Sequence, residues 1–227
     1  MEIRGEKALV LGAGRSGIAS ARFLAEHGAI VALHDTKDIE AWTEAARSLK
    51  ESHNVGLISG QLPSWLLDQI GLVVISPGVP TNTIPARYVD RKDGLVIGEI
   101  ELAYRFLKGR IVGITGSNGK TTTTTLIGEL LKNAGIVTQV GGNSGTPLLN
   151  IAETSTDDSW TVVELSSFQL ETIKEFHPNV AICLNVTPNH LDRYDSFTDY
   201  AAAKHRIFMN QTADDVAVLN ADDEITA

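Results

Sequence analysis

The sequence has little cysteine, no long apolar runs and little positive charge, and each of these features excludes some classes of protein. Its 227 residues include one cysteine, Cys183, so the chain cannot close an internal disulfide. Cys183 lies in the apolar run 180–184, which predicts a buried thiol that is not a nucleophile. No apolar run approaches the roughly 20 residues that a membrane-spanning helix needs.

Positive charge is scarce because 19 Lys and Arg residues stand against 28 Asp and Glu residues, giving a formal net charge of -9. Nucleic acids and anionic membranes attract basic surfaces, so neither is expected as a partner. The charged N-terminus runs directly into a strand pattern, which predicts no signal peptide and a cytoplasmic location. With 43% apolar and 21% charged residues, the composition is that of a globular protein, and the length suits two domains.

The most informative stretch follows a predicted strand at Ile111–Ile114. That strand stops at the turn Gly116-Ser117-Asn118-Gly119, and Lys120 and Thr121 then open a predicted helix. Strand, glycine turn, Lys-Thr and helix form the pattern of a phosphate-binding loop, in which backbone N–H groups and the helix dipole attract phosphate. Lys120 is predicted to reach the outer phosphates, and the Thr121 hydroxyl to bind magnesium. The alternative is an ordinary glycine-rich turn with a surface lysine, since Ile114 replaces one glycine of the strict template.

The first half of the chain carries a second glycine pattern after a predicted strand. Gly12-Ala13-Gly14-Arg15-Ser16-Gly17 has the spacing G-x-G-x-x-G, and a second predicted strand ends at Asp35, about twenty residues on, as in dinucleotide-binding βαβ units. A later predicted strand, 72–75, ends at Ser76-Pro77-Gly78. Ligands of open α/β sheets lie at the carboxyl ends of the strands, so these three segments are predicted to share one edge. Alternatively, the glycines serve helix packing alone.

Together these patterns predict an α/β protein with two domains. The first, 1–108, is expected to be a Rossmann-like parallel-sheet domain, and the second, 109–227, a P-loop ATPase-type domain; a polar break at Lys108-Gly109-Arg110 separates them. The chain stops directly after a predicted strand at 216–219 and a helix-capping sequence, so the second domain is expected to be incomplete.

Within the second domain, the predicted strand 160–164 ends in Glu164. Its position after the phosphate loop predicts a carboxylate that reaches the same magnesium, the alternative being a solvated acid at a strand end. Another predicted strand, 180–184, leads into Asn185–Tyr194, a segment dense in polar groups and also placed at a carboxyl strand end.

Four ordered motifs in this half of the chain resemble one family. They are Thr115–Thr122, Gly141-Gly142-Asn143, Val163–Glu171, and Asn189–Tyr194 with Ala202-Ala203-Lys204. The sequence resembles the Mur ligases, ATP-dependent enzymes that add amino acids to the nucleotide precursor of peptidoglycan, and within them the members that add D-glutamate. The resemblance implies transfer of the ATP γ-phosphate to UDP-N-acetylmuramoyl-L-alanine, giving an acyl phosphate that the amine of D-glutamate attacks. It also implies an amino-acid-binding C-terminal domain that is absent here, so this chain alone is expected to be inactive. A monomer is expected.

The resemblance implies a role for each motif residue. The ATP-binding residues would be Gly116, Ser117, Asn118, Gly119, Lys120, Thr121 and Thr122. Magnesium ligands would be Thr121, Glu164, His190 and Lys204, with Lys120, Glu164, His190 and Lys204 catalytic. Lys204 would act as a carbamate formed with carbon dioxide, whereas the residue pattern alone favours a solvated helix lysine. The substrate-binding residues would be Arg15, Ser16, Asp35, Thr36, Lys37, Ser76, Gly78, Asn143 and His190.

Two other functions stay open from the residues. A nucleotide-binding module without catalytic activity would carry the same phosphate loop. A nicotinamide-dependent oxidoreductase would carry the first glycine pattern, but it would have no use for a phosphate loop in the second domain.

Overall fold

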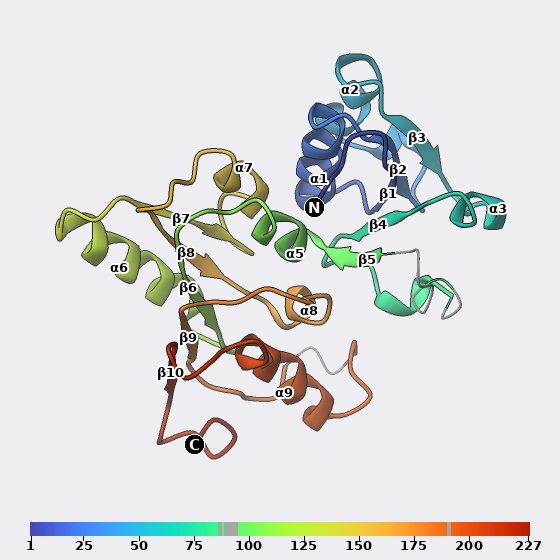
Figure 1. Ribbon diagram of the computed structural model, residues 1–227. Coiled ribbons are helices and arrows are strands. Elements are labelled where there is room, and N and C mark those ends of the chain that lie inside the picture. The colour runs from blue at the N-terminus through green and yellow to red at the C-terminus, as the bar shows by residue number, and fades with distance from the viewer. Residues whose placement is uncertain (86–87, 89–94, 190–191) are drawn as a thin grey trace. The chain divides into compact units, whose positions relative to one another are not determined.

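The computed structural model describes residues 1–85, 88, 95–189 and 192–227, and the chain divides into two compact units, Met1–Leu102 and Ala103–Ala227. Each unit is built on a sheet of five strands, and all the strand pairs found are parallel (Figure 1). The predicted fold class, two parallel-sheet α/β domains, is confirmed. The division between the two units falls after Leu102, inside the helix α5 (Glu99–Tyr104). The polar break at Lys108-Gly109-Arg110, which suggested the boundary, follows that helix. In the described residues, no helix is long and apolar enough to cross a membrane.

The first unit has the strand order β3-β2-β1-β4-β5. Its strands are β1 (Lys7–Leu11), β2 (Ile30–Asp35), β3 (Gly56–Ser59), β4 (Leu72–Ile75) and β5 (Leu95–Gly98). Its helical segments are α1 (Arg15–Glu26), η1 (Ile39–Ala41), α2 (Glu44–Ser52), α3 (Ser64–Leu67), η2 (Thr81–Thr83) and the start of α5 (Glu99–Tyr104). The chain moves outward from β1 to β3 and then returns to place β4 beside β1. The strand order therefore reverses between β1 and β4, where open α/β sheets bind their ligands.

Both faces of this sheet are covered, which explains why its central strands are continuous apolar runs. Helix α1 packs on β1 and β2, and α2 packs on α1 and β3. On the opposite face, Leu9 and Leu11 of β1 and Val73 and Ile75 of β4 form a core cluster with residues of α3 and the segments around it. Neither α2 nor β3 follows from the sequence patterns above, because β3 is a partly exposed strand without an apolar run.

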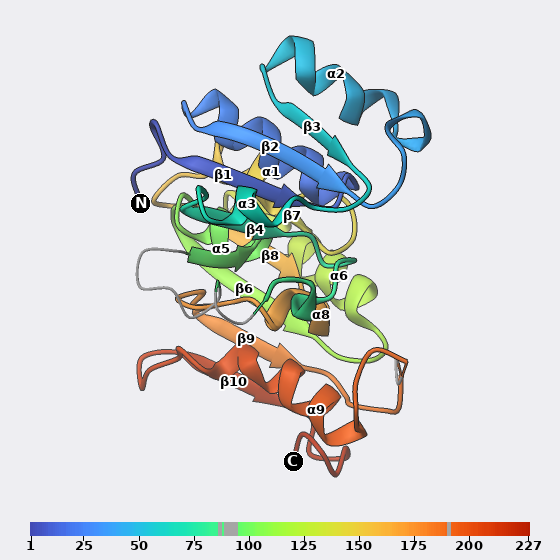
Figure 2. The ribbon, with the colours of Figure 1, turned by 90° about the vertical axis from the view of Figure 1, so that its right-hand side faces the viewer.

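The second unit has the strand order β10-β9-β6-β8-β7, with β6 between β8 and β9 (Figure 2). Its strands are β6 (Arg110–Thr115), β7 (Thr138–Gly142), β8 (Trp160–Glu164), β9 (Val180–Cys183) and β10 (Val216–Leu219). Its helices are α6 (Lys120–Asn133), α7 (Leu148–Ala152), α8 (Ser167–Leu170), α9 (Phe197–His205) and η3 (Arg206–Phe208). The order again reverses at the first strand of the unit, so the carboxyl end of β6 is flanked by the ends of β8 and β9.

Two clusters fill the two sides of this sheet. Val112, Ile114, Val162 and Ile182 alternate along three strands and pack against α6 on one side. On the other side, Cys183 packs with Val186, Tyr200 and Ala201, residues that include part of α9. Figure 1 shows α6 on one side of the sheet and α8 and α9 on the other. Cys183 is buried as predicted, and burial raises the pKa of its thiol to about 11.

Candidate active site

The turn after β6, called here the β6 loop (residues 116–119), has the backbone shape that a phosphate-binding loop needs. Gly116 has φ +151° and Gly119 has φ +83°, values in the region that L-residues with a side chain rarely adopt. Gly119 is the N-cap of α6, and Lys120 is the first residue of that helix. The Lys120 ammonium folds back and donates to the carbonyl oxygens of Gly116, at 2.9 Å, and Ser117, at 3.1 Å. The lysine is thus held directly over the loop.

The amide groups of this segment fall into two sets. Those of Ser117 and Asn118 donate to Asn185, the residue that follows the β9 strand by two positions. The amides of Gly119, Lys120 and Thr121 donate to no acceptor in the described part of the chain. Free N–H groups at the start of a helix, with the positive end of its dipole, attract anions. The second set is therefore available to a phosphate group.

A carboxylate meets the start of α6 from the neighbouring strand β8. Glu164, 2% exposed, accepts hydrogen bonds from the Thr121 hydroxyl at 2.8 Å and from the Asn143 side-chain amide at 2.9 Å. The Asn143 backbone amide donates to the Glu164 carbonyl oxygen at 2.8 Å, which fixes the two residues side by side. The structure thus brings together Thr121, Glu164 and Asn143, which come from three separate motifs.

Lys204 is buried against the other side of the loop. Its side chain on α9 is 2% exposed, and its ammonium donates to the Gly116 carbonyl oxygen at 2.9 Å, the same oxygen that Lys120 uses. It also lies 4.6 Å from the ring centre of Tyr200, a cation–π distance. Burial, and after it the positive charge of Lys120, lower the pKa of Lys204 to about 8 from the ordinary 10.5. The residue pattern alone favoured a solvated lysine, and that expectation is wrong.

The remaining predicted residues of this site are placed less completely. His190 lies outside the described residues. Thr122 is exposed on the first turn of α6. Among the described residues, no group of three or more His, Cys, Asp and Glu side chains is placed so that it could hold a metal ion. The magnesium hypothesis therefore rests on Thr121 and Glu164, which are in contact.

The first unit gathers its predicted residues at the carboxyl ends of β1, β2 and β4. The Ser76 hydroxyl donates to the Gly12 carbonyl oxygen at 3.2 Å, and the Ala13 amide donates to an Asp35 carboxylate oxygen at 2.9 Å. Partial burial would raise the pKa of Asp35, but hydrogen bonds from the amides of Ala13 and Lys37 outweigh it and hold the pKa below its usual value. Asp35 is therefore an anionic hydrogen-bond acceptor beside the glycine turn.

The other residues predicted for this site lie around that edge. Ser16 is half-buried on the first turn of α1. Four more are exposed: Arg15, Thr36, Lys37 and Gly78.

Gly14 and Gly17, the two later glycines of the turn, differ in the space available to a side chain, and this difference gives a matched pair of variants. A Cβ on Gly17 would lie 1.8 Å from the Gly12 carbonyl oxygen, whereas a Cβ on Gly14 would meet nothing within 4 Å. Gly17→Ala is expected to lower the free energy of unfolding by roughly 1–3 kcal/mol, because α1 must move away from the turn. Gly14→Ala, at an ordinary φ of -82°, is expected to change it by less than about 0.5 kcal/mol. Urea unfolding of both variants measures the difference, and equal losses would contradict this account.

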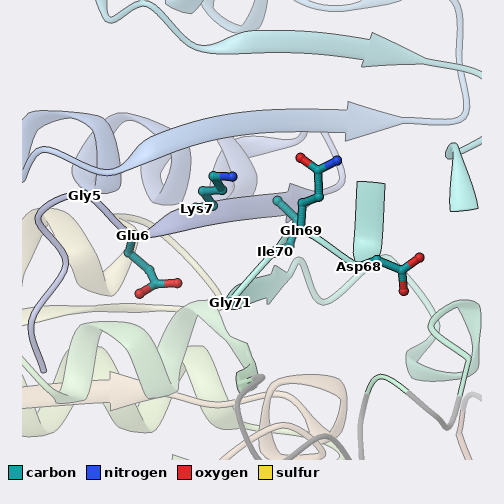
Figure 3. Close-up of a pocket in the computed structure, with 7 residues that line it drawn as sticks. All are labelled: Gly5, Glu6, Lys7, Asp68, Gln69, Ile70 and Gly71. Carbon is teal, nitrogen blue, oxygen red and sulfur yellow. The ribbon is translucent and has the colours of Figure 1, made fainter. Parts of the chain in front are cut away.

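An open hollow in the first unit lies at the opposite edge of its sheet. This shallow pocket of about 350 Å³ is lined by Gly5, Glu6, Lys7, Asp68, Gln69, Ile70 and Gly71, at the starts of β1 and β4 (Figure 3). Figure 3 shows the Glu6 and Asp68 carboxylates pointing in different directions, so they form no acid–base pair. Since ligands of such sheets bind at the carboxyl ends, we do not assign a function to this pocket.

Two residues that the sequence patterns did not single out complete the loop. Asn185 accepts from two loop amides, and Tyr200 exchanges a hydrogen bond with the Ser117 hydroxyl at 2.9 Å. Asn185 lies in the polar segment after β9, so its location carried a signal. Its pairing with Asn118 carried no signal, because the two residues lie 67 positions apart in sequence.

Comparison with known protein families identifies the family to which this chain belongs. The profile of the Mur ligase middle domain matches residues 114–227, and that of the Mur ligase MurD-like N-terminal domain matches residues 6–98. The chain belongs to the Mur ligase family. The middle-domain match includes the β6 loop, Glu164 and Lys204, and the N-terminal match includes the glycine turn and Asp35.

Curated Mur ligases resemble the whole of this chain. The UDP-N-acetylmuramoylalanine–D-glutamate ligase of Acidobacterium capsulatum is 49% identical over 225 residues, which are 99% of this chain and 48% of that protein. The protein of the same name from Koribacter versatilis is 50% identical over 225 residues, 99% of this chain and 49% of the relative. The chain thus spans about half the length of these relatives. A murein peptide ligase from Psychrobacter arcticus shares the fold, with a TM-score of 0.57 at 18% identity over 96% of this chain and 49% of that one.

Proposed function

We propose that this chain carries the nucleotide-sugar and ATP sites of an ATP-dependent ligase that joins D-glutamate to UDP-N-acetylmuramoyl-L-alanine in peptidoglycan precursor synthesis. The observation that carries the proposal is the meeting of Lys120, Thr121, Glu164 and Lys204 at the β6 loop, with free amides beside them. The names of the relatives from Acidobacterium capsulatum and Koribacter versatilis, both D-glutamate ligases, support the choice of D-glutamate.

In this proposal the β6 loop and the start of α6 hold the phosphates of ATP. The free amides of Gly119, Lys120 and Thr121 donate to phosphate oxygens, with Gly116, Ser117, Asn118 and Thr122 forming the rest of the cradle. Lys120 exchanges its two carbonyl partners for the β- and γ-phosphates. The γ-phosphate passes to the carboxylate of the sugar nucleotide, and the amine of D-glutamate then displaces phosphate from the acyl phosphate. Such chemistry depends mainly on positioning and on charge neutralisation.

The chemistry of the donor set fits magnesium. A threonine hydroxyl and a buried carboxylate lie in contact at the start of α6, and Mg²⁺ prefers oxygen ligands of this kind beside substrate phosphates. We propose Thr121 and Glu164 as ligands of one ion, with the Asn143 amide orienting Glu164. His190 and a modified Lys204 are proposed as ligands of a second ion. Bound magnesium would neutralise charge on the transferred phosphate.

For Lys204 we propose a carbamate. Its neutral amine would form an N–C bond to carbon dioxide, one C=O electron pair would move to oxygen, and a proton would leave the nitrogen. Two observations support this modification: the side chain is buried beside the loop, and its lowered pKa makes the neutral amine accessible near pH 8. The product is an anion, and the positive charge of Lys120 beside it favours an anion where it disfavours a second cation.

For the first unit we propose a uridine diphosphate site at the carboxyl ends of β1, β2 and β4. Asp35 and Ser76 flank the glycine turn there, and α1 begins directly after it. The proposed contacts are Arg15, Ser16, Asp35, Thr36, Lys37, Ser76 and Gly78. We also propose a monomer that acts in the cytoplasm, where ATP and nucleotide sugars are made.

Calorimetric titration with UDP-N-acetylmuramoyl-L-alanine, MgATP and NAD tests the proposal. We expect binding of the sugar nucleotide and of MgATP, and none of NAD. Binding of NAD without the sugar nucleotide would instead favour an oxidoreductase. Binding of both expected ligands without ligation by the full-length protein would favour a nucleotide-binding module.

A further inference from the structure

Asn185 makes more contacts with the β6 loop than any role proposed above requires. Its side-chain oxygen accepts from the amides of Ser117, at 3.1 Å, and Asn118, at 2.9 Å. Its side-chain amide donates to the Asn118 carbonyl oxygen at 3.2 Å, and its own carbonyl oxygen accepts from the Ser117 amide at 2.9 Å. One half-buried residue, two positions after β9, therefore binds three backbone groups of the loop: the Ser117 amide, the Asn118 amide and the Asn118 carbonyl oxygen.

These contacts determine which loop amides face a ligand. Ser117 and Asn118 have their N–H groups committed to Asn185, while Gly119, Lys120 and Thr121 have no acceptor in the described residues. A glycine-rich loop is flexible, and ordering it costs conformational entropy at every residue that becomes fixed. A loop that is already held does not incur that cost when a ligand binds.

The residues around Asn185 are themselves fixed. The next amide, that of Val186, donates to the Asp223 carboxylate at 3.1 Å. The Ser117 hydroxyl and Thr187 exchange two hydrogen bonds of 2.9 Å, one through the Thr187 amide and one through its carbonyl oxygen. Residues 185–187 are thus hydrogen-bonded both to the loop and to Asp223.

We infer that Asn185 is a positioning residue for nucleotide binding, which holds the β6 loop so that its later amides converge on phosphate. The inference rests on the proposed ATP site and adds a residue to it. It also has a clear alternative: the Asn185 oxygen occupies amides that the phosphate itself would use, so Asn185 competes with the nucleotide. The two interpretations predict opposite effects of removing the side chain.

The first test is the affinity for MgATP of Asn185→Ala, measured by calorimetry. We expect a loss of roughly tenfold, the value of about one to two hydrogen bonds of ordinary strength. Asn179→Ala is the matched control, because the Asn179 side-chain oxygen accepts from the Ile111 amide at 2.9 Å, at the other end of the same strand pair. We expect that control to bind MgATP as the wild-type protein does. Unchanged or tighter binding by Asn185→Ala would overturn the inference.

The second test needs no nucleotide and uses amide hydrogen exchange read by NMR. In Asn185→Ala the Asn118 amide loses its acceptor, whereas the Ser117 amide keeps the carbonyl oxygen of residue 185. We expect exchange to quicken roughly tenfold or more at Asn118, and less at Ser117. A general loss of stability would affect both amides alike, and that result would overturn the inference.

The wild-type protein gives a third readout that does not depend on a variant. On addition of MgATP, we expect protection to appear at Gly119, Lys120 and Thr121, while Ser117 and Asn118 keep the protection they had. Loss of protection at Asn118 would mean that Asn185 leaves the loop, which contradicts a positioning role. If the wild-type protein binds no MgATP, the proposed function fails, and exchange at Asn118 without nucleotide still decides whether Asn185 holds the loop.

Discussion

Replacing Lys120 with alanine is expected to weaken MgATP binding by roughly 10- to 100-fold, the value of charge-assisted hydrogen bonds to phosphate. It should also slow phosphoryl transfer by roughly 10²–10³-fold, because a positioned positive charge stabilises the transition state more than the bound substrate. The physical reason is the placement of the ammonium, which already lies 2.9 Å from the carbonyl oxygen of Gly116, the first residue of the loop.

A lysine on the same helix serves as the control for this variant. Lys132 lies in the last turn of α6, is exposed, and pairs only with Glu129 at 3.0 Å among the described residues. Lys132→Ala is expected to leave MgATP affinity and turnover within about twofold of wild type. Calorimetry on this chain measures the MgATP affinity of both variants, and release of ADP by the full-length protein with the same substitutions measures turnover. Equal behaviour of the two variants would show that the loop does not bind the phosphates.

Replacing Lys204 with methionine is expected to change how stability depends on pH. The pKa of Lys204 is about 8 in the folded protein, and the ordinary value of 10.5 applies to the unfolded chain. Between these two pH values the unfolded chain therefore binds more protons than the folded one. Stability contributed by this group therefore rises with pH through that window and is flat below it. Relative to Lys204→Met, the wild-type protein should gain roughly 2–3 kcal/mol between about pH 7 and about pH 10.

Urea unfolding at a series of pH values, in buffers free of carbon dioxide, measures this difference. A wild-type-minus-variant difference that stays constant from about pH 7 to about pH 10 would show that the buried amine keeps its ordinary pKa. Added ¹³C-bicarbonate and magnesium then test the modification itself. We expect a carbamate carbon signal in the wild-type protein that is missing in Lys204→Met, and a spectrum with only the free amine would contradict the proposal.

Much of the fold could be predicted because apolar runs and glycine turns are local signals. The central strands of both sheets are buried on two sides, so they stand out as apolar runs, as at Leu72–Ile75 and Trp160–Glu164. By contrast, β3 is only partly buried and α2 is short and mostly exposed, so neither had a strong pattern. Gly141 and Gly142 form the end of β7, because strand pairing with Val163 and Glu164 continues through these glycines.

The site was predictable only as far as its motifs are local. The loop, Lys120 and Thr121 are neighbours in sequence, and a carboxylate at the end of the next central strand can be anticipated from topology. The burial of Lys204 could not, since α9 contains few large apolar residues and its lysine meets Gly116 across 88 positions. The same holds for Asn185, whose importance lies in the amides it meets rather than in its own surroundings in the sequence.

The magnesium dependence of ATP binding tests the central claim most directly. The claim is that the β6 loop, with Thr121 and Glu164, is a magnesium-nucleotide site. Calorimetry should show that the wild-type protein binds ATP at least roughly tenfold more tightly with magnesium than without it, and that Glu164→Gln, which removes the charge but keeps the volume, loses most of this difference. ATP binding that is independent of magnesium in the wild-type protein, or equally dependent on it in Glu164→Gln, would contradict the account.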